Sequence, residues 1–392
     1  MALIRRVTIQ GFRGARDVTL HPGPLCALVG ESSSGKSTVL SAVWALLEAA
    51  APTPTGADVS RGHVRVRVEA AVGERTLFLD ARPPTSLNLN REGAPPALYF
   101  PAALRPTTQL AATDARAHRW ASVVDGSRTP DGGLTLVRSI AALAEARMRG
   151  VVVLIEEPEL FLGPPAQRHL QRLLRALAAR GRNQILYSTH SPVFLGVDRL
   201  DELVLVRHDA RTGTVLVQPE PLDHRHAFRL LSEFDSERAE IFLSRAVLLV
   251  EGRTEKLAFP FVFRALGYDV DAEAITVVDC AGKGNIALFA EICNACGVPY
   301  VVVHDRDAPR GQEPSEAERI ANETLLRIAG PKRTVTLVPD FEAVAGLRAR
   351  RGKPLAAWRR FRAGGDVPGP LRQAAERVVA AARRAPRTTR GA

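Results

Sequence analysis

Cysteine, lysine and long apolar runs are all scarce in this sequence. The chain of 392 residues has too few cysteines for a framework of disulfide bonds, since it contains only Cys26, Cys280, Cys293 and Cys296. Cys293 and Cys296 have the spacing of half a zinc site, but no second pair completes it. No apolar run approaches the ~20 residues that a membrane span needs, and the chain begins with a strand pattern rather than a signal peptide. We therefore expect a soluble, cytoplasmic protein that does not enter a membrane.

Lysine supplies only five of the 53 basic residues, which with 42 acidic residues give a net charge of +11. A positive charge of this size favours a polyanionic partner such as DNA. The bias toward arginine, together with abundant alanine, glycine and proline, reflects overall composition, so a single arginine carries little information. The lysines carry more, because lysine can persist in such a background where arginine will not serve.

The first half of the chain predicts a mostly parallel sheet with helices between its strands. An apolar run at 25–29 leads into a glycine-rich loop and a helix at 38–49. A β-branched run at 151–155 and a strand at 184–187 flank a helix at 165–180, an order typical of parallel sheets. Residues 82–130 are rich in proline and have no assignable period. We also expect a helix at 134–149 and two hairpins, at 4–9 with 18–20 and at 63–70 with 76–80.

The pattern restarts at residue 246 and predicts a second α/β unit of domain size. Its expected strands are 246–250, 275–279, 300–304 and 334–338, and its expected helices are 254–266, 284–296 and 315–329. The predicted organisation is a first domain at 1–222, a helical connector at 223–245, a second domain at 246–345 and a basic C-terminal segment at 346–392. We expect the arginine-rich end, from about residue 375, to fray because it lacks apolar anchors.

A complete G-x-x-x-x-G-K-[ST] loop occupies residues 30–37, between a strand and a helix. In this setting the backbone N–H groups of the loop cradle phosphates at a helix N-terminus. Lys36 is expected to reach the β- and γ-phosphates, and the Ser37 hydroxyl to bind Mg²⁺. The sequence therefore predicts an ATP site that includes Gly30, Ser34, Gly35, Lys36, Ser37 and Thr38.

Two carboxylates follow the buried strand at 151–155. Glu156 is expected to hold the Mg²⁺ shell and Glu157 to orient the attacking water. His190 follows the next strand, within Ser188-Thr189-His190-Ser191-Pro192, where it can contact the γ-phosphate. These residues predict hydrolysis of ATP as well as its binding.

A second acidic set follows two strands of the C-terminal half. Glu251 ends the strand at 246–250, and Asp305 and Asp307 follow the strand at 300–304. In an open parallel sheet, ligands bind at this edge. Several carboxylates in one place raise each other's pKa values unless cations compensate their charge. Because Mg²⁺ and Mn²⁺ prefer oxygen ligands, we expect a divalent metal site here.

The N-terminal half resembles the ABC-type ATPase heads of the SMC/RecF group. Two strings carry the resemblance, Ile155-Glu156-Glu157-Pro158-Glu159 and the segment 188–192. In that group two heads sandwich two ATP molecules, and a glycine-rich signature from one head completes the site of the other. The best signature candidate is Thr129-Pro130-Asp131-Gly132-Gly133, which departs from the usual Ser-Gly-Gly core. Gln109 is the candidate for the glutamine that senses Mg²⁺.

The C-terminal half resembles a Toprim domain, the fold shared by topoisomerases, primases and certain nucleases. The strand-Glu251-Gly252 and strand-Asp305-Arg306-Asp307 elements match it in type, order and spacing. Gly282-Lys283-Gly284-Asn285 and the segment 339–342 match positions of the nuclease branch, whose extra acids make a two-metal site. The resemblance implies that Glu255 and Glu342, and less directly Asp340, add to the metal ligands. It also implies that Lys353 stabilises charge near the scissile phosphate.

An ABC-type head followed by a Toprim domain resembles the OLD (overcoming lysogenization defect) family of ATP-dependent nucleases, over residues 1 to about 360. The implied fold class is α/β, an ABC-type P-loop ATPase head followed by a Rossmann-like Toprim domain. The implied activity is metal-dependent nicking or cleavage of DNA under the control of ATP, in phage defence or DNA processing. One metal ion would activate water while the second stabilises the leaving oxygen.

The expected partners are DNA, a second copy of the chain bound through the heads or the connector, and a further protein. The rival interpretation is a non-nucleolytic, RecF-like DNA-binding ATPase in recombination or repair. A topoisomerase or primase has less support, because none of the four tyrosines lies in a recognisable nucleophile context and no zinc module is present.

Overall fold

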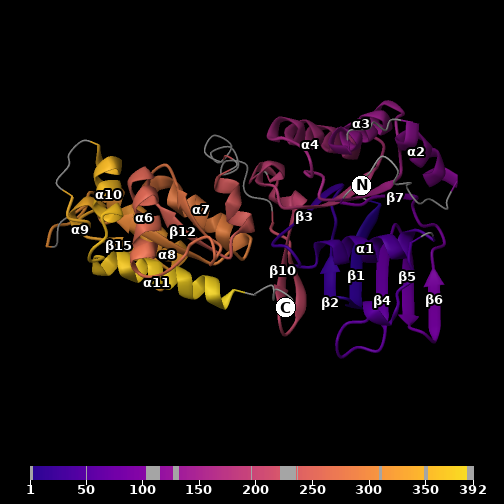
Figure 1. Cartoon of the computed structure of the whole chain (residues 1–392), viewed down its shortest axis with the longest axis horizontal. Helices are drawn as coiled ribbons and strands as arrows, with labels where there is room; N and C mark the ends of the chain where they lie inside the picture. Colours follow the sequence, from indigo (N-terminus) through magenta and orange to yellow (C-terminus); the bar gives the residue numbers. More distant parts are fainter. Residues whose placement is uncertain are drawn as a thin grey trace. The chain divides into compact units, whose positions relative to one another are not determined.

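The computed structural model describes residues 3–49, 51–102, 115–126, 132–195, 197–220, 235, 237–308, 311–347 and 352–385. The chain divides into two compact units near residue 222 (Figure 1). The first unit contains the residues up to Pro221, and the second contains Leu222–Ala385.

A six-stranded sheet with the order β11-β10-β3-β9-β8-β7 forms the centre of the first unit. All its neighbouring strands are parallel except β10 and β11, which form an antiparallel pair. The strands β3, β8 and β9 are almost wholly buried, as their continuous apolar sequences require. The strands are β3 Leu25–Val29, β7 Ala97–Phe100, β8 Val152–Glu156, β9 Gln184–Thr189, β10 Leu203–Asp209 and β11 Gly213–Val217.

An antiparallel sheet with the order β2-β1-β4-β5-β6 lies on the other side of helix α1, Lys36–Leu47 (Figure 1). Its inward-facing residues and those of α1 share one hydrophobic core with strands of the first sheet. Both predicted hairpins belong to this sheet and are confirmed. Its strands are β1 Ile4–Phe12, β2 Ala15–Leu20, β4 Val66–Val72, β5 Arg75–Arg82 and β6 Ser86–Asn90.

Of the further helices of this unit, α2 and α4 contact the parallel sheet, and α3 contacts both of these helices. These helices are α2 Ala115–Gly126, α3 Gly132–Glu145 and α4 Pro164–Ala179. Of these, α4 packs on β3 and β9, and α3 packs on α4. Short 3-10 helices cover Gly56–Asp58 (η1), Pro192–Phe194 (η2) and Val197–Glu202 (η3).

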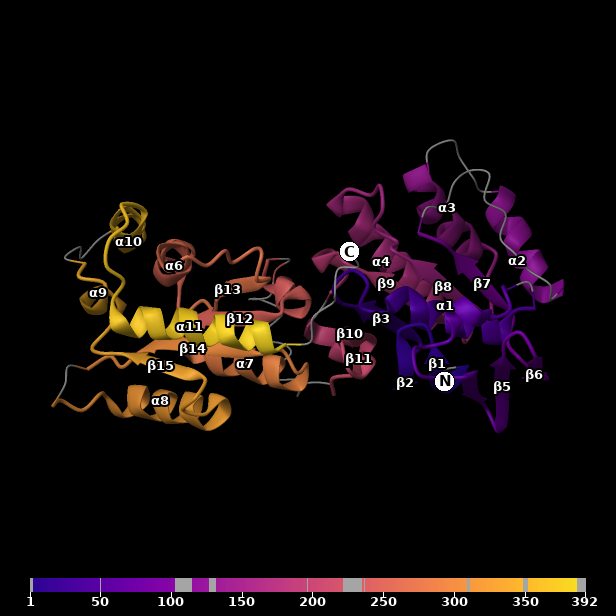
Figure 2. The same cartoon turned by 60° about the horizontal axis from the view of Figure 1, so that its bottom comes forward.

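The second unit is a four-stranded parallel sheet with the order β13-β12-β14-β15. Helices α6 and α11 pack against it on one face, and α7 and α8 cover the other face (Figure 2). The strands are β12 Ala246–Val250, β13 Ile275–Asp279, β14 Tyr300–Asp305 and β15 Thr334–Leu337. The helices are η4 Arg238–Leu243, α6 Arg253–Ala265, α7 Lys283–Ala295, α8 Glu316–Ala329, α9 Phe341–Val344, α10 Lys353–Arg362 and α11 Gly369–Arg384.

The C-terminal end differs from its prediction. The expectation that the chain frays from about residue 375 is wrong for residues 375–385, because α11 continues to Arg384. Alanine and valine side chains, which the sequence analysis did not count as anchors, give α11 a buried apolar face that includes Ala375, Val378 and Ala382. Residues 352–385 therefore belong to the second unit and are not a separate basic segment.

The predicted connector also differs from the structure. Its described part from Glu237 to Arg245 belongs to the second unit, where η4 buries Ile241 and Phe242 and packs on β13.

The predicted α/β fold class, with two largely parallel sheets, is confirmed. Within the described residues, none of the helices is both long and apolar enough to cross a membrane.

Candidate nucleotide and metal sites

The glycine-rich loop joins β3 to α1, as the motif requires, and neighbouring strands press closely against it. A Cβ atom at Gly30 would lie 2.0 Å from the backbone oxygen of Val206 on β10. A Cβ atom at Gly35, whose φ of +111° favours glycine, would lie 2.2 Å from Oγ1 of Thr214 on β11. The Thr214 hydroxyl donates a hydrogen bond to the backbone oxygen of Ser34 at 3.2 Å. The hairpin β10–β11 thus determines the path of this loop, although the sequence analysis assigned neither strand.

Lys36 is buried at the start of α1, and its ammonium group lies across the loop. Its Nζ donates to the backbone oxygens of Gly30 at 2.9 Å and Glu31 at 2.8 Å. Burial lowers the pKa of Lys36 to about 8, while nearby carboxylates, that of Glu157 foremost, oppose the shift. Ser34 Oγ is buried without a hydrogen-bond partner among the described residues. A buried hydroxyl beside a lysine at a helix N-terminus fits the phosphates of a nucleotide.

The other predicted residues of this site lie at neighbouring strand ends. Glu156 is the last residue of β8, opposite Ser188 of β9. Glu157 follows with a left-handed φ of 45°, and its backbone N–H donates to the oxygen of Ser188 at 3.0 Å. His190 Nε2 lies 3.6 Å from Glu157 Oε1. Burial and the charge of Lys36 lower the pKa of His190, with Glu157 acting in the opposite direction.

The first turn of α1 contains the two remaining predicted contacts, Ser37 and Thr38. Ser37 is exposed, so its hydroxyl is accessible to an ion bound outside the loop.

Glu159 is a residue of this site that the sequence analysis quoted without giving it a role. Its Oε1 accepts a hydrogen bond from the backbone N–H of His190 at 2.6 Å, which ties the loop after β8 to the loop after β9. Its Oε2 is buried without a partner among the described residues. Burial raises the pKa of Glu159, while the hydrogen bond from His190 lowers it. Its position in the segment 155–159, which carries the resemblance to ABC-type heads, could have identified Glu159 as a residue of the site.

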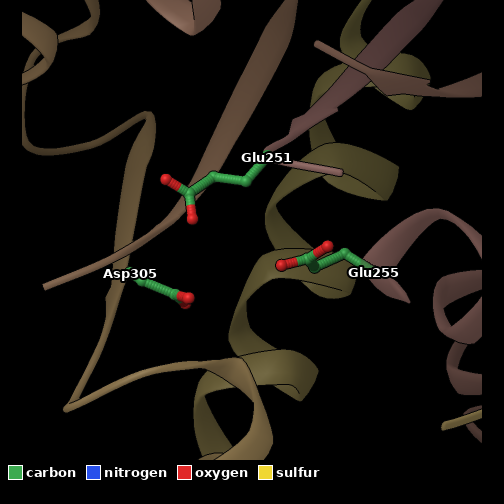
Figure 3. Close-up of side chains that lie close together, drawn as sticks. All are labelled: Glu251, Glu255 and Asp305. Atoms are coloured by element: carbon green, nitrogen blue, oxygen red, sulfur yellow. The ribbon is translucent and has the colours of Figure 1, made fainter. Parts of the chain in front are cut away.

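In the second unit, Glu251, Glu255 and Asp305 converge on one point (Figure 3). Glu251 follows β12, Asp305 ends the adjacent strand β14, and Glu255 comes from the first turn of α6. One carboxylate oxygen of each lies within 4.8 Å of the others. Because parallel strands end at the same edge of the sheet, two of these acids meet there and the helix that follows β12 adds the third.

The three carboxylates destabilise each other's charged forms. Burial raises the pKa of Glu251 and of Glu255 to about 7, and neighbouring acids add to both shifts. Burial and then the charge of Glu251 raise the pKa of Asp305 to about 8. Asp305 Oδ1 is buried and accepts no hydrogen bond from the described residues. A divalent cation with oxygen ligands, such as Mg²⁺ or Mn²⁺, fits this donor set because it compensates the repulsion.

Asp307 lies outside this three-carboxylate cluster. Its φ of 63° turns the chain away after β14, and its Oδ2 accepts a hydrogen bond from Lys283 Nζ at 2.5 Å. The same Nζ also donates to the backbone oxygen of Asp305 at 2.6 Å. Lys283 is therefore a residue of the site, although the sequence analysis noted it only within a matching segment.

Glu342 and Lys353 form an ion pair of 3.0 Å beside the cluster. The hydrogen bond from Lys353 to Glu342 raises the pKa of the lysine. Both residues line the same open pocket of about 1020 Å³ as Glu251, Glu255 and Asp305. Asp340, in contrast, caps helix α9 through a hydrogen bond from the backbone N–H of Ala343 to its Oδ1 at 2.7 Å.

Two sequence-based candidates cannot be placed. Gln109 and residues 129–131 of the expected signature lie outside the described residues, and Gly132 and Gly133 begin α3.

The two units match different protein families. Residues 242–307 match the Toprim domain of overcoming lysogenization defect protein-like proteins. Residues 119–196 match an AAA domain family described as a putative AbiEii toxin of a type IV toxin–antitoxin system. The chain therefore carries an OLD-like Toprim domain and an AAA-type ATPase domain, which confirms the resemblance expected from its motifs.

Individual relatives agree with these matches. An OLD nuclease of Thermus scotoductus is 39% identical over 213 residues, which cover 50% of this chain and 40% of that protein. The Old nuclease of Escherichia phage P2 is 28% identical over 170 residues, which cover 42% of this chain and 29% of that protein. The chain thus aligns with less than half the length of each. Among solved structures, the C-terminal region of the Burkholderia pseudomallei OLD protein is similar at 18% identity over 36% of this chain and 99% of its own, with a TM-score of 0.31.

Proposed function

We propose that this chain is an ATP-regulated, metal-dependent DNA nuclease of the OLD type that nicks or cuts duplex DNA. The observation that carries the proposal is the convergence of Glu251, Glu255 and Asp305 within the part of the chain that matches the OLD-like Toprim domain. The two relatives with the name OLD nuclease support it. The nucleotide loop in the other unit supports control by ATP.

Glu251, Glu255 and Asp305 would hold the divalent metal, and Lys353 and Lys283 provide positive charge at the rim of the same pocket. When bound, Mg²⁺ or Mn²⁺ would supply a polarised water and compensate the charge of the phosphate. Glu342 orients Lys353 toward the pocket through their ion pair, and Lys353 would bind the scissile phosphate. Asp307 keeps Lys283 beside the cluster, so its proposed role is to position this cation.

In the first unit, Lys36 and the loop around it would bind the phosphates of ATP, with Ser37 and Glu156 on the accompanying Mg²⁺. Glu157 would orient the attacking water, and His190, which lies 3.6 Å from it, would contact the γ-phosphate. Two copies of the chain would associate through their ATPase heads. A role in phage defence or in DNA processing is part of this proposal.

The test is incubation of the purified chain with supercoiled plasmid and Mg²⁺ or Mn²⁺, with and without ATP. We expect nicked and linear products, and we expect the ATP lanes to differ from the others. Glu251→Gln should abolish the products because it removes one charge from the cluster without changing its size. The matched control is Glu376→Gln, the same substitution at an exposed position of α11, which should cut normally.

Intact plasmid in every lane together with ATP hydrolysis that DNA stimulates would contradict the nuclease. That result would favour the RecF-like, non-nucleolytic ATPase. Cleavage that survives Glu251→Gln would instead point to a contaminating nuclease or to a different metal site.

A further inference from the structure

Helix α10 begins at the metal pocket and is strongly basic. Its first residue, Lys353, lines the pocket that contains the three-carboxylate cluster. Its ten residues, Lys353–Arg362, include four basic side chains and no acidic one. A helix of this length extends about 15 Å, so α10 carries positive charge from the pocket to a point well outside it.

Only one side of α10 is used for packing. Ala357 and Phe361, one turn apart, are buried, and Phe361 lies against Phe341 with ring centroids 6.4 Å apart. Helix α6, which also starts at the pocket, is the main neighbour of α10 (Figure 2). The opposite side presents Leu355, which is 51% exposed, together with the exposed side chains of Arg359 and Arg362.

The two exposed arginines differ from the third arginine of the helix. Arg360 donates to the backbone oxygens of Gly364 and Asp366, so it has a structural role in closing the end of α10. Arg359 and Arg362 have no carboxylate partner among the described residues. Arg362 instead lies over the ring of Trp358, with its guanidinium carbon 4.6 Å from the ring centroid. This cation–π contact holds the guanidinium group on the outer side of the helix.

We propose that the outer face of α10, made of Trp358, Arg359 and Arg362, binds the phosphate backbone of the DNA that enters the metal pocket. The proposal rests on the proposed nuclease function and adds the path of its substrate. Arg359 and Arg362 contact phosphates, and Trp358 is a positioning residue that orients Arg362. Lys353 and Arg362 are nine residues, or about 14 Å, apart along the axis of the helix, so the face lies beyond the pocket end of α10.

DNA is favoured over a protein partner for two reasons. The helix that carries this face begins, at Lys353, beside a pocket whose acidic cluster suits a metal ion and a phosphodiester. The charge of the face is of one sign, and guanidinium groups match phosphate oxygens well. Arginines in the last turn of a helix also interact favourably with the helix dipole. That interaction does not depend on which side of the helix the arginines occupy, so it does not explain why Arg359 and Arg362 are both exposed on the same side.

The test is the affinity of the full chain for a labelled duplex at several salt concentrations, measured by fluorescence anisotropy in a Glu251→Gln background that does not cut. Arg359→Ala with Arg362→Ala should weaken binding by roughly 30-fold or more and lower the slope of log K against log salt by about two. The matched control is Arg327→Ala, an exposed arginine in the last turn of α8 on the opposite face of the sheet. It should leave both quantities unchanged.

The role of Trp358 is tested separately by comparing Trp358→Phe with Trp358→Ala. The phenylalanine keeps a ring under Arg362 and should retain most of the affinity, whereas the alanine should lose as much as Arg362→Ala does. Combining Trp358→Ala with Arg362→Ala should cost little beyond either change, because both remove one contact. Fully additive losses would show that Trp358 acts independently of Arg362.

Unchanged affinity and salt slope in the double arginine variant would overturn the proposal, and so would a parent chain that binds no DNA. A loss in Arg327→Ala equal to that in Arg359→Ala alone, one charge in each case, would show that only net charge matters. Normal DNA affinity of the arginine variant, together with plasmid cleavage when the same two substitutions are made with Glu251 intact, would reject the α10 face and leave the nuclease in place. If the chain with Glu251 intact binds DNA through α10 but never cuts plasmid, the DNA-binding face is retained and the nuclease is rejected. Circular dichroism of each variant shows whether it is folded.

Discussion

At the scale of single residues, the acidic cluster makes the stability of the folded chain depend on pH. Carboxyl groups with pKa values near 7 to 8 in the folded protein take up protons on folding, since their ordinary values are 3.8 to 4.5. Their contribution to stability is therefore present at low pH and is lost as the pH rises through these folded values. A divalent cation held by this cluster, as proposed, would reverse the trend, because a metal binds the deprotonated carboxylates.

We predict that Mn²⁺ raises the melting temperature of the chain more at pH 8 than at pH 6. Below about pH 6.5 the protons compete with the metal, whereas above pH 8 the carboxylates are charged and repel each other until the metal binds. Differential scanning calorimetry with Mn²⁺ and with EDTA measures the difference. Glu251→Gln should reduce it and Glu376→Gln should not. Equal stabilisation by Mn²⁺ at both pH values would contradict the assignment.

Gly30 is a second residue whose effect can be predicted. Its Cβ position lies 2.0 Å from a backbone oxygen of β10, which cannot move without distorting the strand. Gly30→Ala should therefore cost about 2 kcal/mol or more of stability and weaken ATP binding. Gly56→Ala is the control, since no atom lies within 4 Å of the added methyl group and its φ is not in the left-handed region. Denaturant unfolding and nucleotide titration measure the two effects.

At the scale of elements, α11 shows how a basic sequence can still form part of a core. It packs on β12, β14 and β15, and its apolar positions recur at helical spacing. The arginines between them, such as Arg377 and Arg383, point outward and bond to the backbone oxygen of Thr334 and to Glu273 respectively. The composition of this segment does not indicate a buried helix, because alanine and arginine dominate it. The helical spacing of its apolar residues does indicate one.

We predict that Leu371→Ala on α11 destabilises the second unit by about 3 kcal/mol. Leu371 is wholly buried, so the change removes apolar contact and leaves a cavity between the helix and the sheet. Gln373→Ala, at an exposed position of the same helix, should have no more than a small effect. Urea unfolding followed by circular dichroism compares the two. Equal stability of the Leu371 variant and the parent would mean that α11 does not dock as described.

At the scale of the whole molecule, the two sites belong to different compact units, so each should be inactivated separately. Glu251→Ala should abolish cleavage and leave ATP binding intact. Lys36→Ala should reduce ATP hydrolysis by about 100-fold or more and remove the effect of ATP on cleavage, while leaving metal-dependent cleavage without ATP. Plasmid cleavage and phosphate release, measured on the same preparations, give the result. Loss of both activities in either variant would argue against separable sites.

Most of the regular elements were predictable because their residues have a clear period. All four strands and three of the helices of the second unit follow apolar runs of the expected length. Strands β6, β7, β10 and β11 were not predicted, and β6 and β7 lie in the region 82–130 that had no assignable period. β7 is four residues long within a proline-rich region, and β10 and β11 gain their definition from pairing with β3 and with each other. Short strands depend on their neighbours more than on their own sequence.

The sequence by itself determined the nucleotide loop, the order of the two units and the acids at the ends of β12 and β14. Their spacing after apolar strands carries that information locally. Only the tertiary structure decided which acids meet. It brings Glu255 to Glu251 and Asp305 through the turn into α6, and it pairs Asp307 with Lys283 instead. The physical reason is that side-chain direction at a strand end depends on backbone angles, such as the left-handed φ of Asp307, and on neighbours distant in sequence.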